Sequence, residues 1–306
     1  MSVTVVIPTF ERPGGLARAA RSVLAQDVPG LELVIADNAS GPETVAITRA
    51  LAEQDRRVRV LRHAENLGLT ENFNAGWRAA TGDYVMALAD DDWLEPGYLT
   101  TCAARLDGDP GLVLVSGEAR YWSPDAAEPR PGDAVALDSG NPARRVAHWY
   151  RHVSDNVAIY GLIRREALLR ALPMRHSLAG DWLLLAGIAT QGRFGVVRGT
   201  WLNRSAGGTS ASHQHAARAM GLSRLQARFP HYAIAAMAAA EPYRRPDLYD
   251  RRRAAIAAAG AWGVLRNHPL ELVEDVVGPW LGHPRLSGVD SRVRAWGRRR
   301  RGDTDY

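Results

Sequence analysis

Three consecutive aspartates, Asp90 to Asp92, directly follow the apolar run "YVMALA" in this 306-residue chain. Adjacent carboxylates repel one another and resist burial, so a simple solvated turn would more often scatter them among neutral polar residues. We therefore expect a positive charge beside these aspartates. Two other polar clusters also follow apolar runs: "PTFER" at residues 8–12 and "DNAS" at residues 37–40.

The polar clusters alternate with segments of regular hydrophobic pattern. A continuous apolar run at residues 3–7 indicates a strand buried on both faces, and further strands are expected at residues 31–37, 58–63 and 83–90. Amphipathic helices are indicated at residues 14–26, 41–54 and 71–82, the last closed by Gly82. This alternation predicts a doubly wound parallel sheet, in which ligands bind at the carboxyl ends of the strands. The polar clusters, with "NLG" near the third strand, should then converge on one crevice.

The composition excludes several classes of site. No lysine occurs among the 38 basic residues, which excludes a Schiff-base lysine and a Walker-type phosphate-binding lysine. The single cysteine, Cys102, excludes a disulfide framework and a cysteine zinc cluster. Much of the net charge of +5 comes from late arginine runs and does not imply nucleic acid. Without an apolar run of roughly 18 residues or an N-terminal signal pattern, we expect a cytoplasmic protein.

The rhythm changes after residue 95. The pattern then predicts a helix and a strand within residues 96–117, followed by a Pro/Gly/Asp-rich loop at residues 121–143. A strand and a helix are expected within residues 156–172, then a helix opened by Asp181 and a strand at residues 193–205. The remainder is Ala/Arg-rich and is expected to be mainly helical.

Four segments in order, "VTVVIPTFERP", "LVIADNAS", "NLGLTENFNAGWRAATGDYVMALADDDWLEP" and "GDWLLL", resemble the family 2 glycosyltransferases. These are inverting enzymes with the GT-A fold, and the resemblance covers roughly residues 1 to 210. It implies an α/β, Rossmann-like fold with a mostly parallel central sheet flanked by helices. We expect a GT-A domain at residues 1–212, with nucleotide-sugar binding in 1–100 and acceptor binding and the catalytic base in 101–212. Residues 213–306 would form a helical C-terminal region.

For the acidic run, the resemblance implies a divalent cation between the protein and a sugar nucleotide. Such a cation would neutralise the diphosphate and stabilise it as a leaving group, and oxygen ligands suit Mg²⁺ or Mn²⁺. Ala89 stands where the family often has its first aspartate, so more than one ligand pair fits the spacing. We favour Asp91 and Asp92 as metal ligands, with Asp91 also contacting the donor and Asp90 directed towards its ribose or diphosphate. The alternative is an acidic loop that caps a following helix.

The first two turns are implied to hold a pyrimidine base. Asp37 would accept a hydrogen bond from the ring N3–H, a donor that cytosine lacks, which favours a UDP- or dTDP-sugar. The alternative for Asp37 is a local Asx turn within "DNAS". The other residues that the resemblance assigns to this pocket are Pro8, Thr9, Phe10, Glu11, Arg12 and Asn38.

Asn66, Gly68, Asn72 and Gly76 match family positions beside the sugar nucleotide. Gly68 would let the backbone approach closely, and the asparagine amides can bond ribose or phosphate. Asn72 stands where arginine is also common, so the cation or Arg62 would supply the missing positive charge. Turn chemistry and helix capping explain these residues equally well.

An inverting transfer needs one general base for the acceptor hydroxyl. "GDWLLL" matches the family's late helix and assigns the base to Asp181, with Gly180 in place of the usual acid; Asp181 is also a candidate N-cap. Trp182 would line the acceptor or sugar pocket. Further on, "WLNRSAGGTSASHQH" looks like a loop that closes over the diphosphate, in which Arg204 and His213 are candidates for a phosphate contact or a further metal ligand.

The expected function is a metal-dependent inverting glycosyltransferase whose hydroxyl acceptor is a glycan, a lipid-linked saccharide or a natural product. A sugar-1-phosphate nucleotidyltransferase is the alternative enzyme, although "PTFERPGG" is a poor version of its glycine-rich loop. A non-catalytic nucleotide-sugar-binding relative is a third reading, supported only by Ala89 and Gly180. For the arginine-rich end, a solvated tail is favoured over contact with a membrane surface. The sequence leaves the oligomeric state open.

Overall fold

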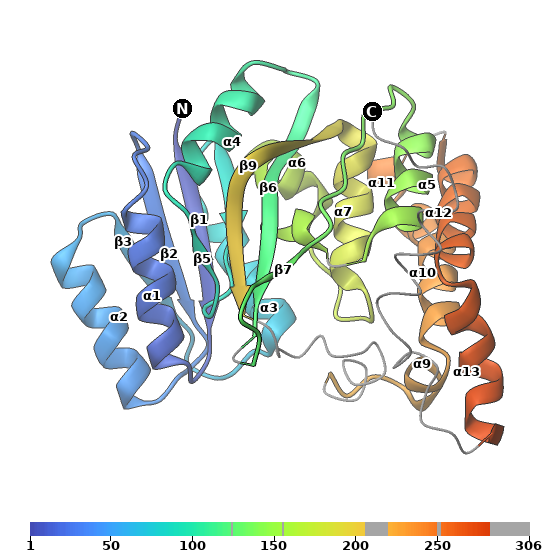
Figure 1. The fold of residues 1–306 in the computed structure, drawn as a ribbon, viewed down its shortest axis with the longest axis horizontal. Coiled ribbons are helices and arrows are strands. Elements are labelled where there is room, and N and C mark those ends of the chain that lie inside the picture. The colour runs from blue at the N-terminus through green and yellow to red at the C-terminus, as the bar shows by residue number, and fades with distance from the viewer. Residues whose placement is uncertain (124, 155, 206–219, 250–251, 282–306) are drawn as a thin grey trace.

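The computed structural model describes residues 1–123, 125–154, 156–205, 220–249 and 252–281 (Figure 1). The strands are β1 Val3–Thr9, β2 Leu31–Asp37, β3 Val58–Arg62, β4 Tyr84–Ala87, β5 Trp93–Leu94, β6 Leu112–Trp122, β7 Arg130–Pro131, β8 Leu162–Arg164 and β9 Arg193–Ser205. The helices are α1 Pro13–Leu24, α2 Pro42–Gln54, α3 Leu69–Ala79, α4 Tyr98–Asp107, α5 Pro142–His152, the 3-10 helix η1 Val157–Tyr160, α6 Arg165–Ala171, α7 Gly180–Gln191, α9 Arg224–Arg228, α10 Pro230–Arg244, α11 Pro246–Tyr249, α12 Arg253–Asn267 and α13 Pro269–Leu281.

Within the described residues, nine strands form one sheet in the order β3-β2-β1-β4-β8-β6-β9-β5, with β7 paired to β6. The first four strands of this order are parallel, as the sequence predicts. The second half is mixed, because β8 runs antiparallel to β4 and β6 while β9 is parallel to β6. The α/β fold with a mostly parallel sheet is therefore confirmed.

The parallel half brings the ends of β1 and β2 together. In β1 and β2, almost every residue is buried, and the register places the last residues of the two strands, Thr9 and Asp37, opposite each other. Helix α3 can lie close on β1 because Gly76 faces the side chain of Val6, where a Cβ atom would collide. Gly82 does not close α3, which ends at Ala79; it instead lies against the start of β1.

Two further local predictions are corrected. Residues 157–160 form the 3-10 helix η1 rather than a strand, and only Leu162–Arg164 pair in the sheet. Strand β6 continues through Trp122 into the segment expected to be loop, because it pairs along β9 as far as Ser205.

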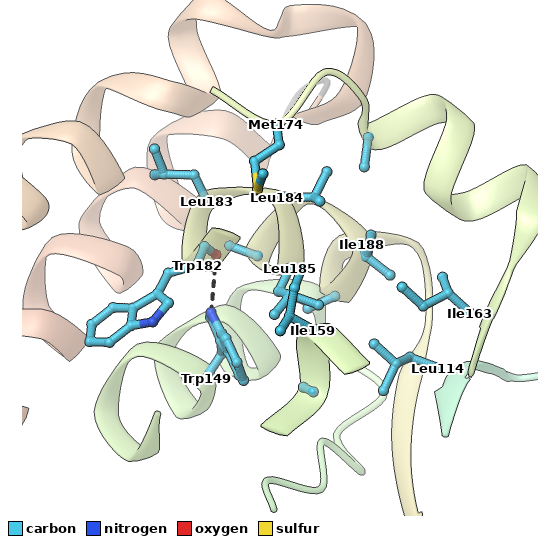
Figure 2. Close-up of a cluster of buried hydrophobic side chains, with 14 of the residues drawn as sticks. Leu114, Trp149, Ile159, Ile163, Met174, Trp182, Leu183, Leu184, Leu185 and Ile188 are labelled. Carbon is cyan, nitrogen blue, oxygen red and sulfur yellow. Dashed lines mark hydrogen bonds between the residues drawn. The ribbon is translucent and has the colours of Figure 1, made fainter. Parts of the chain in front are cut away.

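A large hydrophobic core lies between the sheet and the C-terminal helices. Figure 2 shows α7 at its centre, where Leu184, Leu185 and Ile188 pack among Leu114, Ile159 and Ile163. The same cluster includes Ile234 of α10 and Val264 of α12. The C-terminal helices therefore share a hydrophobic core with the sheet. The expected domain boundary at residue 212 lies outside the described residues.

Buried Arg145 joins α5 to the end of α7, where its guanidinium donates to the carbonyls of Ala189 at 2.6 Å and Thr190 at 3.1 Å. These are terminal helix carbonyls that lack partners within their own helix. None of the described helices combines the length and the apolar character that crossing a bilayer requires.

Candidate active site

The three aspartates form a tight turn between β4 and β5. The turn is closed by a hydrogen bond from the Asp92 amide to the Ala89 carbonyl, at 3.1 Å. Because β4 lies beside β1, Asp90 reaches the end of β1 and accepts a hydrogen bond from Thr9 Oγ1 at 2.8 Å. The turn leads into β5, and α4 is capped by Gly97, so the alternative of a helix-capping acidic loop is wrong.

Positive charge surrounds this acidic turn, as the sequence predicts. Arg12 forms ion pairs with Asp91 and, at 3.6 Å, with Asp90. Arg18 of α1 donates to the Asp91 carbonyl at 2.6 Å. Arg204 donates to Asp92 at 3.1 Å. The arginines come from two distant parts of the chain, the start of α1 and the end of β9, and converge on one turn.

The carboxylates of this turn differ in burial. Burial raises the pKa of Asp90 to about 6, although the hydrogen bond from Thr9 and the charge of Arg12 act against this shift. Burial likewise raises the pKa of Asp92 to about 6, against the opposing effect of Arg204. The side chain of Asp91 is 29% exposed and is the most accessible of the three.

The second turn, at residues 37–41, follows β2 and is bonded to residues at the ends of β1 and β3. Asp37 is fully buried; its Oδ1 accepts from the Ser40 amide at 3.0 Å and its Oδ2 is paired with Arg62. The local turn interaction expected as an alternative is therefore present. Glu11 connects the first turn to this one, since its side chain accepts from the Gly41 amide at 2.9 Å. Phe10, which directly follows β1, is 45% exposed.

The third turn, at residues 66–68, is held by a series of hydrogen bonds between amide groups, called here the amide chain. Asn38 donates to Asn66 Oδ1 at 2.8 Å, and the same oxygen accepts from the Gly68 amide at 2.8 Å. Gly68 caps α3 with a φ of +79°, a conformation that suits glycine. Asn72 is 2% exposed and binds the Ala36 carbonyl at 2.9 Å, so it fastens α3 to β2 rather than facing the crevice.

Arg204, near the end of β9, occupies the centre of the site. Its guanidinium contacts Asp92, the hydroxyl of Tyr121 at 2.7 Å and the hydroxyl of Tyr160 at 3.3 Å. The Tyr160 ring centroid lies 4.4 Å from the guanidinium carbon. Burial alone would lower the pKa of Arg204, but the two tyrosines and Asp92 outweigh burial and raise it. Arg204 is therefore a permanent positive charge inside the site.

Asp181 lies in the first turn of α7, within electrostatic reach of Arg204. Its carboxylate is bonded to the side-chain amide of Asn156 and accepts from the Trp182 amide at 3.0 Å. Burial raises the pKa of Asp181, which these hydrogen bonds partly offset. The N-cap of α7 is Ala179, so the N-cap role considered for Asp181 is wrong.

Trp182 follows Asp181 in the first turn of α7. Its side chain is buried in the helical layer, where the ring stacks on His268 with centroids 5.9 Å apart. Its carbonyl accepts from Trp149 Nε1 at 3.1 Å (Figure 2). The expectation that Trp182 lines the pocket is therefore corrected: it anchors the base of α7 to the C-terminal helices. His213 lies outside the described residues.

Sequence reasoning missed Tyr121, Tyr160 and Asn156. All three contact a predicted site residue. Sequence position was the only indication of a role for these three residues, because each lies in the part of the chain that follows β4. Pairing between β6 and β9, which sets Tyr121 opposite Arg204, joins segments too far apart for a local pattern to reveal.

A family model described as glycosyl transferase family 2 matches residues 4–171, more than half of the 306-residue chain. The chain belongs to glycosyl transferase family 2. The matched region contains the acidic turn and its partners Thr9, Arg12 and Arg18. Asp181 and Arg204 lie beyond it.

Among curated members, this family 2 chain is 25% identical over 158 residues to glycosyltransferase GlyA of Streptococcus pneumoniae, covering 52% of this chain and 21% of that protein. It is 34% identical over 100 residues to the GalNAc(5)-diNAcBac-PP-undecaprenol beta-1,3-glucosyltransferase of Campylobacter jejuni, covering 32% of each. The chain thus spans a third or less of the length of these two relatives.

Solved structures resemble the family 2 chain over most of its length. The mannosyltransferase PcManGT of Pyrobaculum calidifontis, in complex with GDP-Man and Mn²⁺, has a TM-score of 0.59 at 18% identity, covering 96% of this chain and 82% of that one. S. aureus TarS 1-349 in complex with UDP has a TM-score of 0.58 at 14% identity, covering 93% of each chain. These likenesses show the shared fold.

Proposed function

We propose that this chain is a cation-dependent, inverting glycosyltransferase that transfers a sugar from a UDP- or dTDP-sugar to an acceptor hydroxyl. One observation carries the proposal. Arg204 is bonded to Asp92 and interacts electrostatically with Asp181, so one largely buried arginine connects the acidic turn with the proposed base. Family membership and structural neighbours that hold UDP or a nucleotide sugar support the same reaction class.

For the donor, we propose that the first two turns form the nucleoside pocket. Asp37, Phe10 and Asn38 stand at the ends of β1 and β2, next to each other. In this proposal, the base N3–H donates to Asp37 in place of, or beside, its contact with Arg62. Asn66 and Gly68 support the pocket through the amide chain that holds Asn38. An exposed Phe10 ring offers an apolar face to the base.

The carboxylates of the acidic turn suit a divalent cation that is shared with the diphosphate of the sugar nucleotide. Among the described residues, no cluster of three His, Cys, Asp or Glu side chains could hold a metal ion by itself. Mg²⁺-like ions are commonly held by one or two carboxylates together with substrate phosphates. Asp91 is the ligand that the geometry supports best, because its carboxylate is the most exposed, although its ion pair with Arg12 must open or be shared with the ion. Asp92 would bind the ion only after releasing Arg204 or the Ser205 amide.

In the proposed reaction, Asp181 accepts the proton of the acceptor hydroxyl. The hydroxyl oxygen forms a bond to the anomeric carbon as the bond from that carbon to the diphosphate oxygen breaks, and the diphosphate leaves with the electron pair. Arg12 and Arg204 stabilise the negative charge that develops on the leaving group. When bound, the cation supplies further neutralisation of that charge. Attack from the opposite face inverts the anomeric configuration.

The acceptor is proposed as a saccharide, lipid-linked saccharide or other small hydroxyl compound. Support for a lipid-linked saccharide comes from the name of the Campylobacter relative, which specifies a glycan on diphosphate-undecaprenol.

The experiment is a panel of UDP-, dTDP- and GDP-sugars with Mn²⁺, scored for donor hydrolysis and for transfer to hydroxyl acceptors, with the product anomer identified by NMR. Asp181→Asn and Asp91→Asn should each lower turnover by at least about a hundredfold. Asp27→Asn, an exposed aspartate outside the site, is the matched control. Full activity in both site variants would reject the assignment. Pyrophosphate release from UTP and a sugar 1-phosphate would favour the nucleotidyltransferase reading instead.

A further inference from the structure

A second surface feature lies between α5 and α12, at the end of the molecule opposite α1 and α2 (Figure 1). It is a depression of about 260 Å³ whose lining includes Arg144, His148, Arg151, Trp262 and Arg266. These residues belong to α5 and α12, whereas the acidic turn lies between β4 and β5 and Asp181 lies on α7. The depression is therefore separate from the proposed active site.

The charge of this surface has one sign. Neither α5, "PARRVAHWYRH", nor α12, "RAAIAAAGAWGVLRN", contains an acidic residue. Within the part of the chain that the structure describes, Arg144, Arg151 and Arg266 have no ion-pair partner. By contrast, the arginines around the candidate active site are matched by carboxylates. A second depression, of about 460 Å³ at the start of α5, is also lined by an arginine, Arg252.

Large apolar groups lie exposed among these cations. The side chain of Trp262 is 62% exposed and that of Leu265, one helical turn further along α12, is 38% exposed. They are not needed to pack the two helices together, because α12 packs on α5 through its opposite face. There a Cβ atom at Gly263 would lie 2.8 Å from Tyr150 Cβ. The outward face of this helix pair is therefore without a partner in the described residues.

We propose that the α5–α12 face docks on the surface of an anionic lipid bilayer. Guanidinium groups pair with lipid phosphates, and each cation near such a surface adds to binding. Indole rings favour the headgroup level, where their apolar body and polar N–H are both accommodated. A polyanion such as nucleic acid would match the arginines but offers no apolar layer to Leu265 and Trp262. This inference is independent of the proposed reaction.

The test is co-sedimentation of the full chain with vesicles of phosphatidylcholine alone, or with about 30% phosphatidylglycerol added. We expect binding to the anionic vesicles only, weakened at about 0.5 M salt because surface charges are then screened. Replacing Arg144, Arg151 and Arg266 by glutamine together should lower the partition coefficient by about a hundredfold, since each cation near an anionic surface contributes roughly fivefold. Trp262→Ser should lower it by about threefold or more.

The matched control replaces Arg21, Arg49 and Arg56, exposed arginines of the α1–α2 end, by glutamine, and should bind like the wild type. Far-ultraviolet circular dichroism confirms that each variant is folded. Equal binding of the α5–α12 variant and the wild type would overturn the proposal. So would equal binding to neutral vesicles, or binding to a DNA duplex together with failure to bind anionic vesicles.

Discussion

Arg204 Nε donates to Asp92 Oδ2 at 3.1 Å, and this pair joins β9 to the turn that follows β4. Both side chains are largely buried, 16% exposed for Arg204 and 2% for Asp92. The next residue, Ser205, strengthens the junction by donating its amide to Asp92 Oδ1 at 3.0 Å. The acidic turn is therefore held by β9, from the mixed half of the sheet, as well as by β1.

Arg204→Met should destabilise the fold strongly, because it leaves Asp92 buried without its cation. Breaking a buried pair in this way costs about 3–5 kcal/mol. The control is Arg170→Met, which removes the exposed i,i+4 pair with Glu166 and should cost less than about 1 kcal/mol. Urea denaturation of the two variants measures the difference. Equal losses would show that Arg204 contributes no more than a surface ion pair.

Asp90 should make the cation-free protein less stable as the pH rises. Its pKa is raised to about 6 when folded, above the ordinary value of 3.8, so the native state holds its proton more tightly than the unfolded state does. The contribution favours folding below pH 4 and is lost as the pH rises through about 6.

Asp90→Asn removes this titration. The stability of the variant relative to the wild type should therefore increase by about 2–3 kcal/mol between pH 4 and pH 7. Urea denaturation at both pH values provides the measurement. A relative stability that stays constant with pH would mean that the Asp90 pKa is not raised.

Gly76→Ala tests the close approach of α3 to β1. The added methyl would collide with Val6, so we expect a loss of about 1–3 kcal/mol despite the better helix propensity of alanine. Gly14→Ala, in α1, meets no atom within 4 Å and should change stability by less than about 1 kcal/mol. Thermal unfolding of both variants decides the point. An unchanged melting temperature for Gly76→Ala would contradict the packing described here.

Asn156 should tune the proposed base. Its amide is bonded to Asp181 and favours the ionised carboxylate, and its φ of +47° is one that glycine also adopts. In Asn156→Gly, the pKa of Asp181 should therefore rise further, and the acidic limb of the pH–rate profile should move up by about one pH unit. Ala179→Gly, at a φ of +53°, changes a similar backbone position without removing an amide and should leave the profile in place.

The parallel half of the fold could be predicted from the sequence because its signals are local. The run "LELVIAD" is β2 residue for residue. In the mixed half, "RFGVVRGTWLNRS" is likewise β9. The chain direction of β8 could not be predicted, since three residues carry no pattern that distinguishes parallel from antiparallel pairing. The prediction that Gly82 ends α3 was wrong because its signal was not local. Gly82 lies close to the backbone of β1, and α3 has already ended at Ala79.

The same distinction applies to the site. That Thr9 and Asp90 meet follows from the ends of parallel neighbouring strands, and their hydrogen bond confirms the expected convergence. The burial of Trp182 against His268 could not be foreseen, because it depends on how the C-terminal helices pack on α7. Contacts within the parallel sheet were predictable, whereas those that depend on distant helices were not.

The most direct test of the central claim is calorimetric titration of UDP into the protein with and without Mn²⁺. The account predicts that wild-type binding requires Mn²⁺ and that Asp91→Asn weakens it by at least about tenfold, because the ion then loses its most exposed carboxylate. Asp181→Asn should bind UDP with unchanged affinity, since the base acts on the acceptor. Equal UDP affinity in the wild type and Asp91→Asn, with no dependence on Mn²⁺, would contradict the account.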